Sequence, residues 1–230
     1  MRILGLQKLT LLDYPGKMAC TVFTGGCNFR CPFCHNAPLV TGAAEQPALE
    51  ETEFFDFLGR RTDILEGVCI TGGEPTLQPD LEEFIRKIRK MGFAVKLDTN
   101  GYLPQVLISL AGKGLLDYVA MDIKSAPDGY ARAAGLPELD LSLVQKSIDF
   151  LMRAELDFEF RTTVVRELHT PQDITAIGQW LAGEEKYFLQ AFSDSGHLMA
   201  DGLHGYDKNE MLSLLKLLKG DLPNAEIRGI

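Results

Sequence analysis

The sequence lacks any uninterrupted apolar run near the roughly 20 residues that a membrane-spanning helix needs. It is also poor in basic charge, because 23 lysines and arginines stand against 32 aspartates and glutamates, a formal net charge of −9. Surfaces that follow phosphate backbones are basic, so we expect neither a membrane nor a nucleic acid as partner. The first residues lack the apolar stretch and cleavage site of a secretory signal, and we therefore expect a cytoplasmic protein.

Repeats, low-complexity tracts and linkers rich in proline, glycine or serine are also missing. Hydrophobic residues make up 46% of the chain, a proportion typical of a globular protein with its own core. We therefore predict one domain over residues 1–230.

The cysteines number five, and an odd number without a secretory signal argues against a disulfide framework. Cys20 and Cys69 lie inside apolar runs, where we expect buried thiols in strands. The other three crowd into residues 27–34 with the spacing C-x3-C-x2-C. Such crowding in a cytosolic chain indicates metal or redox chemistry.

Short apolar runs alternate with helical patterns along the chain. The predicted strands are residues 20–23, 67–70, 93–97, 118–121, 158–165 and 187–189, and the predicted helices are 81–88, 144–152, 170–181 and about 207–219. The strands are nearly continuous in hydrophobicity, as in parallel strands covered on both faces. Alternation of this kind predicts βα units around a parallel sheet.

Polar clusters follow the predicted strands. They occupy residues 24–36, 71–75, 98–101, 122–124 and 166–167. In a β/α barrel the carboxyl ends of the strands share one rim, where active sites form. Six units fall short of eight, so we predict an α/β fold of the partial (β/α)6 TIM-like barrel type with parallel strands, open on one side.

The cysteine cluster admits three interpretations. Three thiolates could hold a [4Fe-4S] cluster that normally takes four, which leaves one iron open for a substrate. Cys27, Cys31 and Cys34 with His35 could instead bind zinc, although adjacent Cys34 and His35 cannot easily reach one tetrahedral ion. The run from Cys31 to His35 also fits covalent haem attachment, a modification found outside the cytosol.

The cysteine spacing, followed by Gly72-Gly73-Glu74-Pro75, resembles the radical S-adenosylmethionine superfamily over residues 8 to 195. The segment 24–36 is similar to pyruvate formate-lyase activating enzymes, and 12–17 to anaerobic ribonucleoside-triphosphate reductase activating proteins. The chain thus resembles the glycyl-radical activating enzymes.

The resemblance implies that Cys27, Cys31 and Cys34 hold a [4Fe-4S] cluster. An electron from this cluster would cleave S-adenosylmethionine to a 5′-deoxyadenosyl radical, which abstracts hydrogen from a glycine of a partner enzyme. The implied partners are a glycyl-radical protein, such as an anaerobic ribonucleotide reductase or a formate-lyase-type enzyme, and flavodoxin or a similar electron donor. The alternative is a radical enzyme acting on a small molecule, like 7-carboxy-7-deazaguanine synthase.

The same resemblance assigns site residues. Cofactor contacts are expected at Phe33, Asn36, Gly72, Gly73, Glu74, Asp98, Asp122 and Lys124, with a monovalent cation near Asp98 and Asp122. Asp13, His35 and Arg161 would face the substrate glycine. The sixth predicted strand departs from the pyruvate formate-lyase activating enzyme, because a histidine expected after it is absent and His197 is out of register.

Overall fold

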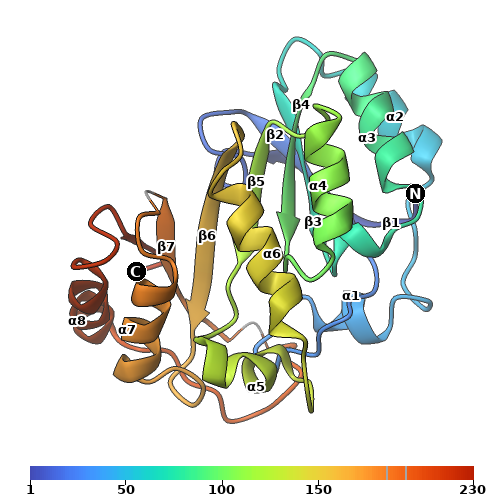
Figure 1. The fold of residues 1–230 in the computed structure, drawn as a ribbon. Coiled ribbons are helices and arrows are strands. Elements are labelled where there is room, and N and C mark those ends of the chain that lie inside the picture. The colour runs from blue at the N-terminus through green and yellow to red at the C-terminus, as the bar shows by residue number, and fades with distance from the viewer. Residues whose placement is uncertain (185, 195) are drawn as a thin grey trace.

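A computed structural model describes residues 1–184, 186–194 and 196–230 (Figure 1). One eight-stranded sheet runs in chain order from β1 to β8. Its strands are β1 (Ile3–Thr10), β2 (Ala19–Thr24), β3 (Gly67–Gly72), β4 (Ala94–Thr99), β5 (Tyr118–Asp122), β6 (Asp157–Val164), β7 (Tyr187–Ala191) and β8 (Glu226–Arg228). Strand β1 pairs antiparallel with β2, and all later neighbours are parallel.

The six predicted strands correspond to β2–β7, which confirms the predicted barrel class. Two edge strands were not predicted. Strand β1 mixes exposed and half-buried side chains, and β8 has three residues, so neither shows the apolar run of a strand covered on both faces. In the part of the chain that the structure describes, β1 and β8 do not pair, and the barrel stays open between them.

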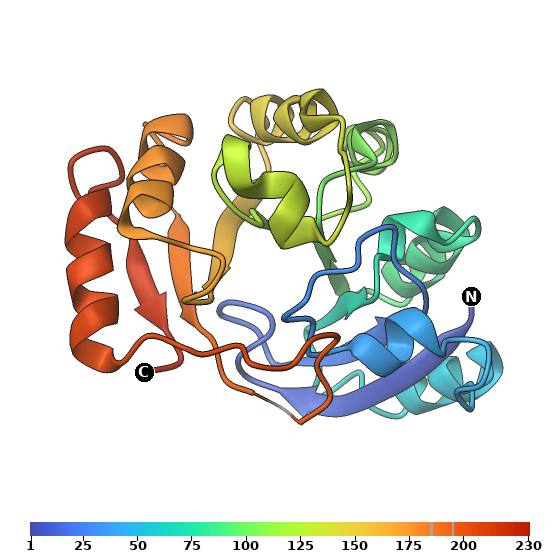
Figure 2. The same ribbon diagram turned by 90° about the horizontal axis from the view of Figure 1, so that it is seen from below.

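Helices cover the outer face of the curved sheet (Figure 2). They are α1 (Ala37–Thr41), α2 (Glu51–Gly59), α3 (Leu81–Lys90), α4 (Pro104–Gly112), α5 (Tyr130–Ala134), α6 (Leu141–Leu151), α7 (Pro171–Trp180) and α8 (Lys208–Leu218), with 3-10 turns at Pro75–Leu77 and Pro127–Gly129. The four predicted helices are confirmed as α3, α6, α7 and α8. None of the helices in the described residues is long and apolar enough to span a membrane.

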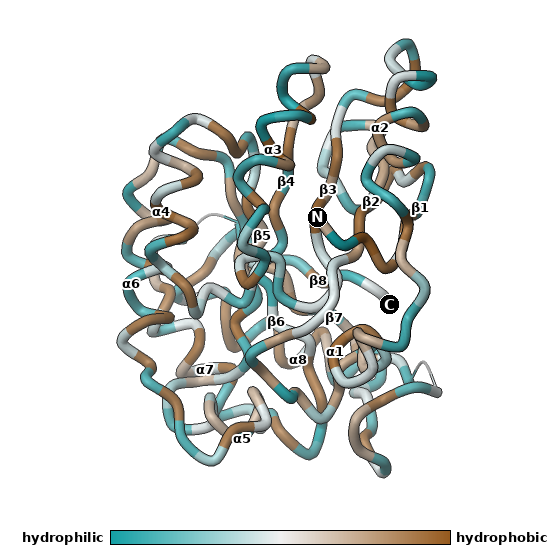
Figure 3. Tube along the Cα trace, turned by 90° about the vertical axis from the view of Figure 1, so that its right-hand side faces the viewer, coloured by the Kyte–Doolittle hydropathy of each residue, from teal (hydrophilic) through white to brown (hydrophobic). Residues whose placement is uncertain are grey.

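Amphipathic patterning sets how the helices pack. In α3, Leu81, Phe84, Ile85 and Ile88 are buried, while charged residues occupy the outer face. Hydrophobic and hydrophilic stretches alternate along the helices in Figure 3. Helix α7 begins with the predicted signal, because Thr170 and Asp173 form a capping box and Pro171 occupies the first turn.

The inside of the barrel, unlike its outer core, is polar. Alternate residues of a strand point to opposite faces, so Lys96 and Asp98 of β4 share the inner face. Glu159 and Arg161 do the same on β6. Arg228 of β8 makes two hydrogen bonds of 2.7 and 2.9 Å to the buried Glu159 carboxylate, which ties the last strand to the barrel interior.

Candidate active site

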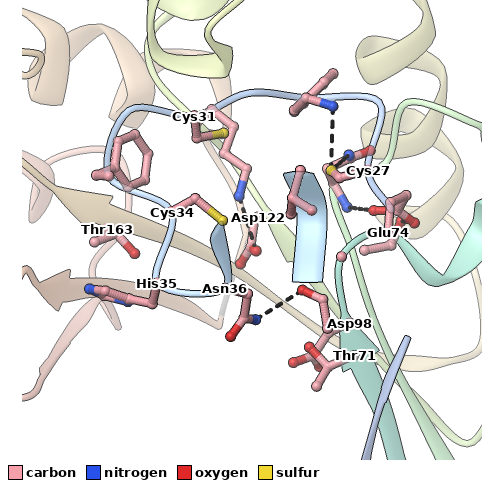
Figure 4. Close-up of a pocket in the computed structure, with 18 of the residues that line it drawn as sticks. Cys27, Cys31, Cys34, His35, Asn36, Thr71, Glu74, Asp98, Asp122 and Thr163 are labelled. Carbon is pink, nitrogen blue, oxygen red and sulfur yellow. Dashed lines mark hydrogen bonds and ion pairs between the residues drawn. The ribbon is translucent and has the colours of Figure 1, made fainter. Parts of the chain in front are cut away.

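A cavity of about 240 Å³ opens at the carboxyl ends of the strands (Figure 4). The predicted polar clusters meet here, as expected from the topology. Its lining includes all three clustered cysteines and all eight predicted cofactor contacts, together with His35 and Arg161. Side chains separated by more than 130 residues in sequence therefore share one site.

Close backbone contacts fix the position of the cysteine loop. The amides of Gly73 and Glu74 donate to the carbonyls of Thr24 (2.9 Å) and Gly26 (2.8 Å). Gly72 has a φ of +111°, and a Cβ on Gly73 would lie 1.9 Å from the Gly26 oxygen. The resemblance implies that both glycines contact the cofactor, and in the structure they also allow the backbone of the cysteine loop to approach closely.

The other side of the loop rests on the end of α5. The Arg30 amide donates to the Ala134 carbonyl at 2.8 Å. Gly135 follows with a φ of +69°, and a Cβ there would meet the Arg30 carbonyl at 1.9 Å. Two glycine contacts, at positions 73 and 135, therefore hold the loop from opposite sides.

The three thiols point toward the cavity (Figure 4). Burial raises the pKa of Cys27 to about 11 and that of Cys31 to about 12, and it also raises the pKa of Cys34. The Phe29 amide, 3.3 Å from the Cys27 sulfur, and the Lys124 ammonium oppose this effect. Cysteine binds metal as a thiolate, so loading this site would release protons.

Glu74 uses its carboxylate to join two strand ends. One oxygen accepts from the Thr76 amide (3.1 Å), the Thr76 hydroxyl (2.5 Å) and the Thr99 hydroxyl (2.8 Å). The other accepts from the Asn100 amide at 2.8 Å. Burial raises its pKa although these bonds lower it. The side chain thus links β3 to β4 and fixes one end of the predicted cofactor site.

Ion pairs build the opposite part of the cavity. The Arg161 Nε donates to Asp122 at 2.9 Å, and the guanidinium lies 3.4 Å from Asp98. Lys124 lies 3.2 Å from the other Asp122 oxygen, and Lys96 pairs with Asp98. Burial favours neutral carboxyls, but the cations outweigh it, holding the pKa of Asp122 at about 2 and that of Asp98 below its usual value.

The three residues predicted to face the substrate do not all lie at the cavity. His35 lies at the cavity, where its Nε2 contacts the Ser193 carbonyl at 2.7 Å and its ring stacks on Phe192. Arg161 sits between the two aspartates. Asp13 belongs to the loop before β2, at the opposite end of that strand from the cysteines, and its carboxylate accepts from Thr21 at 2.6 Å. Their roles stay predictions.

The donor set fits an iron–sulfur cluster better than a single ion. A cubane cluster distributes its cysteine ligands over different irons, so the sulfurs need not converge on one point. Among the described residues, no three His, Cys, Asp or Glu side chains are arranged around a single metal position. His35 is turned toward Ser193 and Phe192, which argues against both the zinc and the haem interpretations.

Several lining residues were not among the individually predicted contacts. They are Thr71, Thr99 and Asn100, which lie within the predicted polar clusters, and Thr163 and Gln190, which lie outside them. Gln190 lies on β7, the sixth predicted strand, where the expected histidine is absent. Lys96 was also missed, although a lysine inside an apolar strand two residues before Asp98 was a usable signal.

Comparison with known proteins identifies the family. The family model "Radical SAM superfamily" matches residues 21–178, more than half of the chain. This chain is a member of the Radical SAM superfamily. The superfamily implies a [4Fe-4S] cluster and S-adenosylmethionine as cofactors and an enzyme with radical chemistry, which confirms these predictions.

Individual relatives differ in function. The chain is 33% identical to "Putative glycyl-radical enzyme activating enzyme MJ1227" of Methanocaldococcus jannaschii, over 98% of this chain and 95% of that protein. It is 26% identical to the 7-carboxy-7-deazaguanine synthase of Thermoplasma acidophilum, over 91% and 92%. The fold is similar to that of Streptococcus suis SuiB bound to precursor peptide SuiA, with a TM-score of 0.72 and 14% identity, over 91% of this chain and 48% of that one.

Proposed function

We propose that this radical enzyme activates a glycyl-radical protein. The observation that carries the proposal is the similarity, over nearly both full lengths, to the M. jannaschii protein named as such an enzyme. The cysteine loop of residues 24–36 supports it, since its sequence resembles that of glycyl-radical activating enzymes. The proposed targets are an anaerobic ribonucleotide reductase or a formate-lyase-type enzyme, with flavodoxin or a similar protein as electron donor.

The residues of the cavity suit this chemistry. Cys27, Cys31 and Cys34 would hold the cluster by three thiolates. When bound, the cofactors supply a one-electron cleavage of the sulfonium carbon–sulfur bond, giving methionine and a 5′-deoxyadenosyl radical that takes a hydrogen atom from glycine. Lys124 has one carboxylate partner, Asp122, and lines the cavity, so its ammonium would pair with the methionyl carboxylate.

The open side of the barrel supports a protein substrate. Strands β1 and β8 form the two sheet edges in the described residues, and the Arg228–Glu159 pair connects β8 to the barrel interior. A loop of a partner protein could enter between these edges and bring a glycine α-carbon toward the cavity. His35 lies at the rim of the same cavity and would contact that loop.

The test follows the hydrogen atom that is transferred from the glycine α-carbon of the partner protein to 5′-deoxyadenosine. The reconstituted protein, a reductant, S-adenosylmethionine and a candidate glycyl-radical protein labelled with α-deuterated glycine are mixed anaerobically. We expect a glycyl signal by electron paramagnetic resonance and deuterium in 5′-deoxyadenosine by mass spectrometry. The matched control is the partner with its radical glycine changed to alanine, which should give neither. Deuterium-free 5′-deoxyadenosine with every glycyl-radical protein of the source organism would contradict the proposal.

A second candidate function rests on the T. acidophilum relative, which also matches most of both chains. The cavity then would take a small molecule, and its inward charges at Arg161 and Lys124 would contact that substrate rather than position cofactor alone. Formation of 7-carboxy-7-deazaguanine-type product without any partner protein would favour this candidate.

A further inference from the structure

The carboxylates of Asp98 and Asp122 are already paired with cations of the protein. Each of the four oxygens has a cationic partner among the described residues. Asp98 is bound by Lys96 on one oxygen and faces Arg161 on the other at 3.4 Å. Asp122 is bound by Arg161 at 2.9 Å and by Lys124 at 3.2 Å. The guanidinium of Arg161 bridges the two carboxylates, where the resemblance places a monovalent cation.

The net charge around Asp98 and Asp122 also disfavours an added cation. The cations of Lys96, Lys124 and Arg161 face the carboxylates of Asp98 and Asp122, and Arg161 also lies 4.0 Å from Glu159, which pairs with Arg228. Four cations against three carboxylates leave one positive charge. A further monovalent cation would add repulsion at short range in a region of low dielectric constant. An incoming carboxylate would bring the local charge to zero.

Lys96 is the unusual member of this group. Its side chain is 1% exposed, and it lies inside β4 rather than at a strand end. Its Nζ contacts Asp98, with the Cys69 sulfur 3.8 Å away as the other polar neighbour in hydrogen-bond range. Charged side chains are rarely buried without a partner, so the ammonium and the Asp98 carboxylate depend on each other.

We infer that Lys96 and Arg161 replace the monovalent cation that the family resemblance implies, so that S-adenosylmethionine binds without added Na⁺ or K⁺. Lys96 is a positioning residue, because it holds Asp98 against Arg161 beneath the cofactor cavity. The inference depends on membership in the superfamily and not on which molecule supplies the hydrogen atom.

The first experiment uses the unaltered protein. Reconstituted, oxidised enzyme is titrated anaerobically with S-adenosylmethionine by calorimetry, in K⁺, in Na⁺ and in tetramethylammonium at equal ionic strength. Because the cluster stays oxidised, no turnover contributes. We expect the same dissociation constant, within about twofold, in all three salts. Binding that weakens several-fold in tetramethylammonium would overturn the inference, and this result requires no variant to fold.

The second experiment removes the buried charge with Lys96→Met, which keeps a similar length. In tetramethylammonium we expect S-adenosylmethionine to bind roughly tenfold more weakly, because Asp98 loses a buried partner. K⁺ should restore most of the affinity by taking the vacated place beside Asp98. The matched control is Lys146→Met on the exposed face of α6, which should bind like the unaltered protein in every salt.

Two results from the variant would contradict the inference. One is unchanged affinity in tetramethylammonium, and the other is a loss that neither K⁺ nor Na⁺ restores. The electron paramagnetic resonance spectrum of the reduced cluster, with and without S-adenosylmethionine, reports separately whether the cofactor reaches the cluster. Since neither measurement involves a partner protein, failure here is distinguishable from failure of the proposed activase function.

Discussion

Two parts of the cavity wall are built by different forces. The cluster wall, defined here as residues 24–36 and 72–74, is held by backbone hydrogen bonds and by glycines that allow close contact. The charged wall, defined as Asp98, Asp122, Lys124 and Arg161, is held by ion pairs, and Lys96 supports it from beneath. The first should therefore be sensitive to added volume and the second to lost charge.

This difference suits what each wall must hold. A cluster bound by thiolates needs three sulfurs at fixed positions, and backbone contacts fix positions without adding charge. A charged small molecule needs counter-charges that are already oriented, because orienting them on binding would cost free energy. The following changes test the division, beginning with the largest expected effect.

Removing one cysteine of the cluster wall should abolish the cluster. Cys31→Ala is expected to lose nearly all of the about four irons per chain that a [4Fe-4S] cluster contributes, measured by iron and sulfide analysis after anaerobic reconstitution. The matched control is Cys20→Ala, in β2, which should keep its iron because that thiol is buried in the sheet. Retention of full iron by Cys31→Ala would contradict the ligand assignment.

Adding one methyl group should damage the cluster wall without changing any charge. Gly73→Ala places a Cβ against the Gly26 oxygen, so we expect the free energy of unfolding to fall by about 3 kcal/mol and iron incorporation to drop. Gly112→Ala at the end of α4 meets no atom within 4 Å and should change stability by less than about 1 kcal/mol. Urea unfolding measures both variants. Equal losses of unfolding free energy would show that the close contact at Gly73 does not matter for stability.

Neutralising the charged wall should leave the cluster in place. Arg161→Met exposes Asp98 and Asp122 to each other, and we expect a loss of roughly 2 kcal/mol in urea unfolding with iron content unchanged, because the site is partly open to water. The double change with Asp122→Asn should recover part of that loss. If the double variant lost more unfolding free energy than the two single variants together, repulsion between the carboxylates would not be the cause.

The smallest effect concerns His169, which is buried beneath the charged wall. Its Nδ1 accepts from the Val165 amide at 3.0 Å, and its Nε2 lies 2.7 Å from the Lys124 carbonyl. Burial lowers its pKa, so the unfolded chain takes up the proton first as pH falls. Stability should therefore decrease below pH about 6.5, by at most about 1.4 kcal/mol per pH unit.

The variant His169→Gln should be less stable at neutral pH and should show a weaker dependence of unfolding free energy on pH between 7 and 5. The exposed His197 gives the control, since His197→Gln should keep the dependence of the unaltered chain. An identical pH dependence in both variants would show that His169 is not the titrating group.

The sequence indicated the central six strands because their apolar runs must be covered on both faces wherever they occur. It indicated neither β1 nor β8. Strand β1 is an edge strand with an exposed side, and β8 is stabilised by its contact with β7 and by the Arg228–Glu159 pair. Such strands depend on partners distant in the chain, which local patterning does not contain.

For the site, cysteine spacing and residue type indicated metal or redox chemistry but left an iron–sulfur cluster, zinc and haem open. The resemblance to the radical S-adenosylmethionine superfamily was needed to predict the [4Fe-4S] cluster and S-adenosylmethionine. The reason for Gly73 and the place of Lys96 were settled by the tertiary structure. Whether a position requires glycine depends on which backbone segment packs against it. Whether a lysine can be buried depends on the carboxylates that strand pairing places beside it. The sequence by itself determined which chemical groups this protein contains. The tertiary structure decided which of them contact one another, because contacts depend on distance in space and not on separation along the chain.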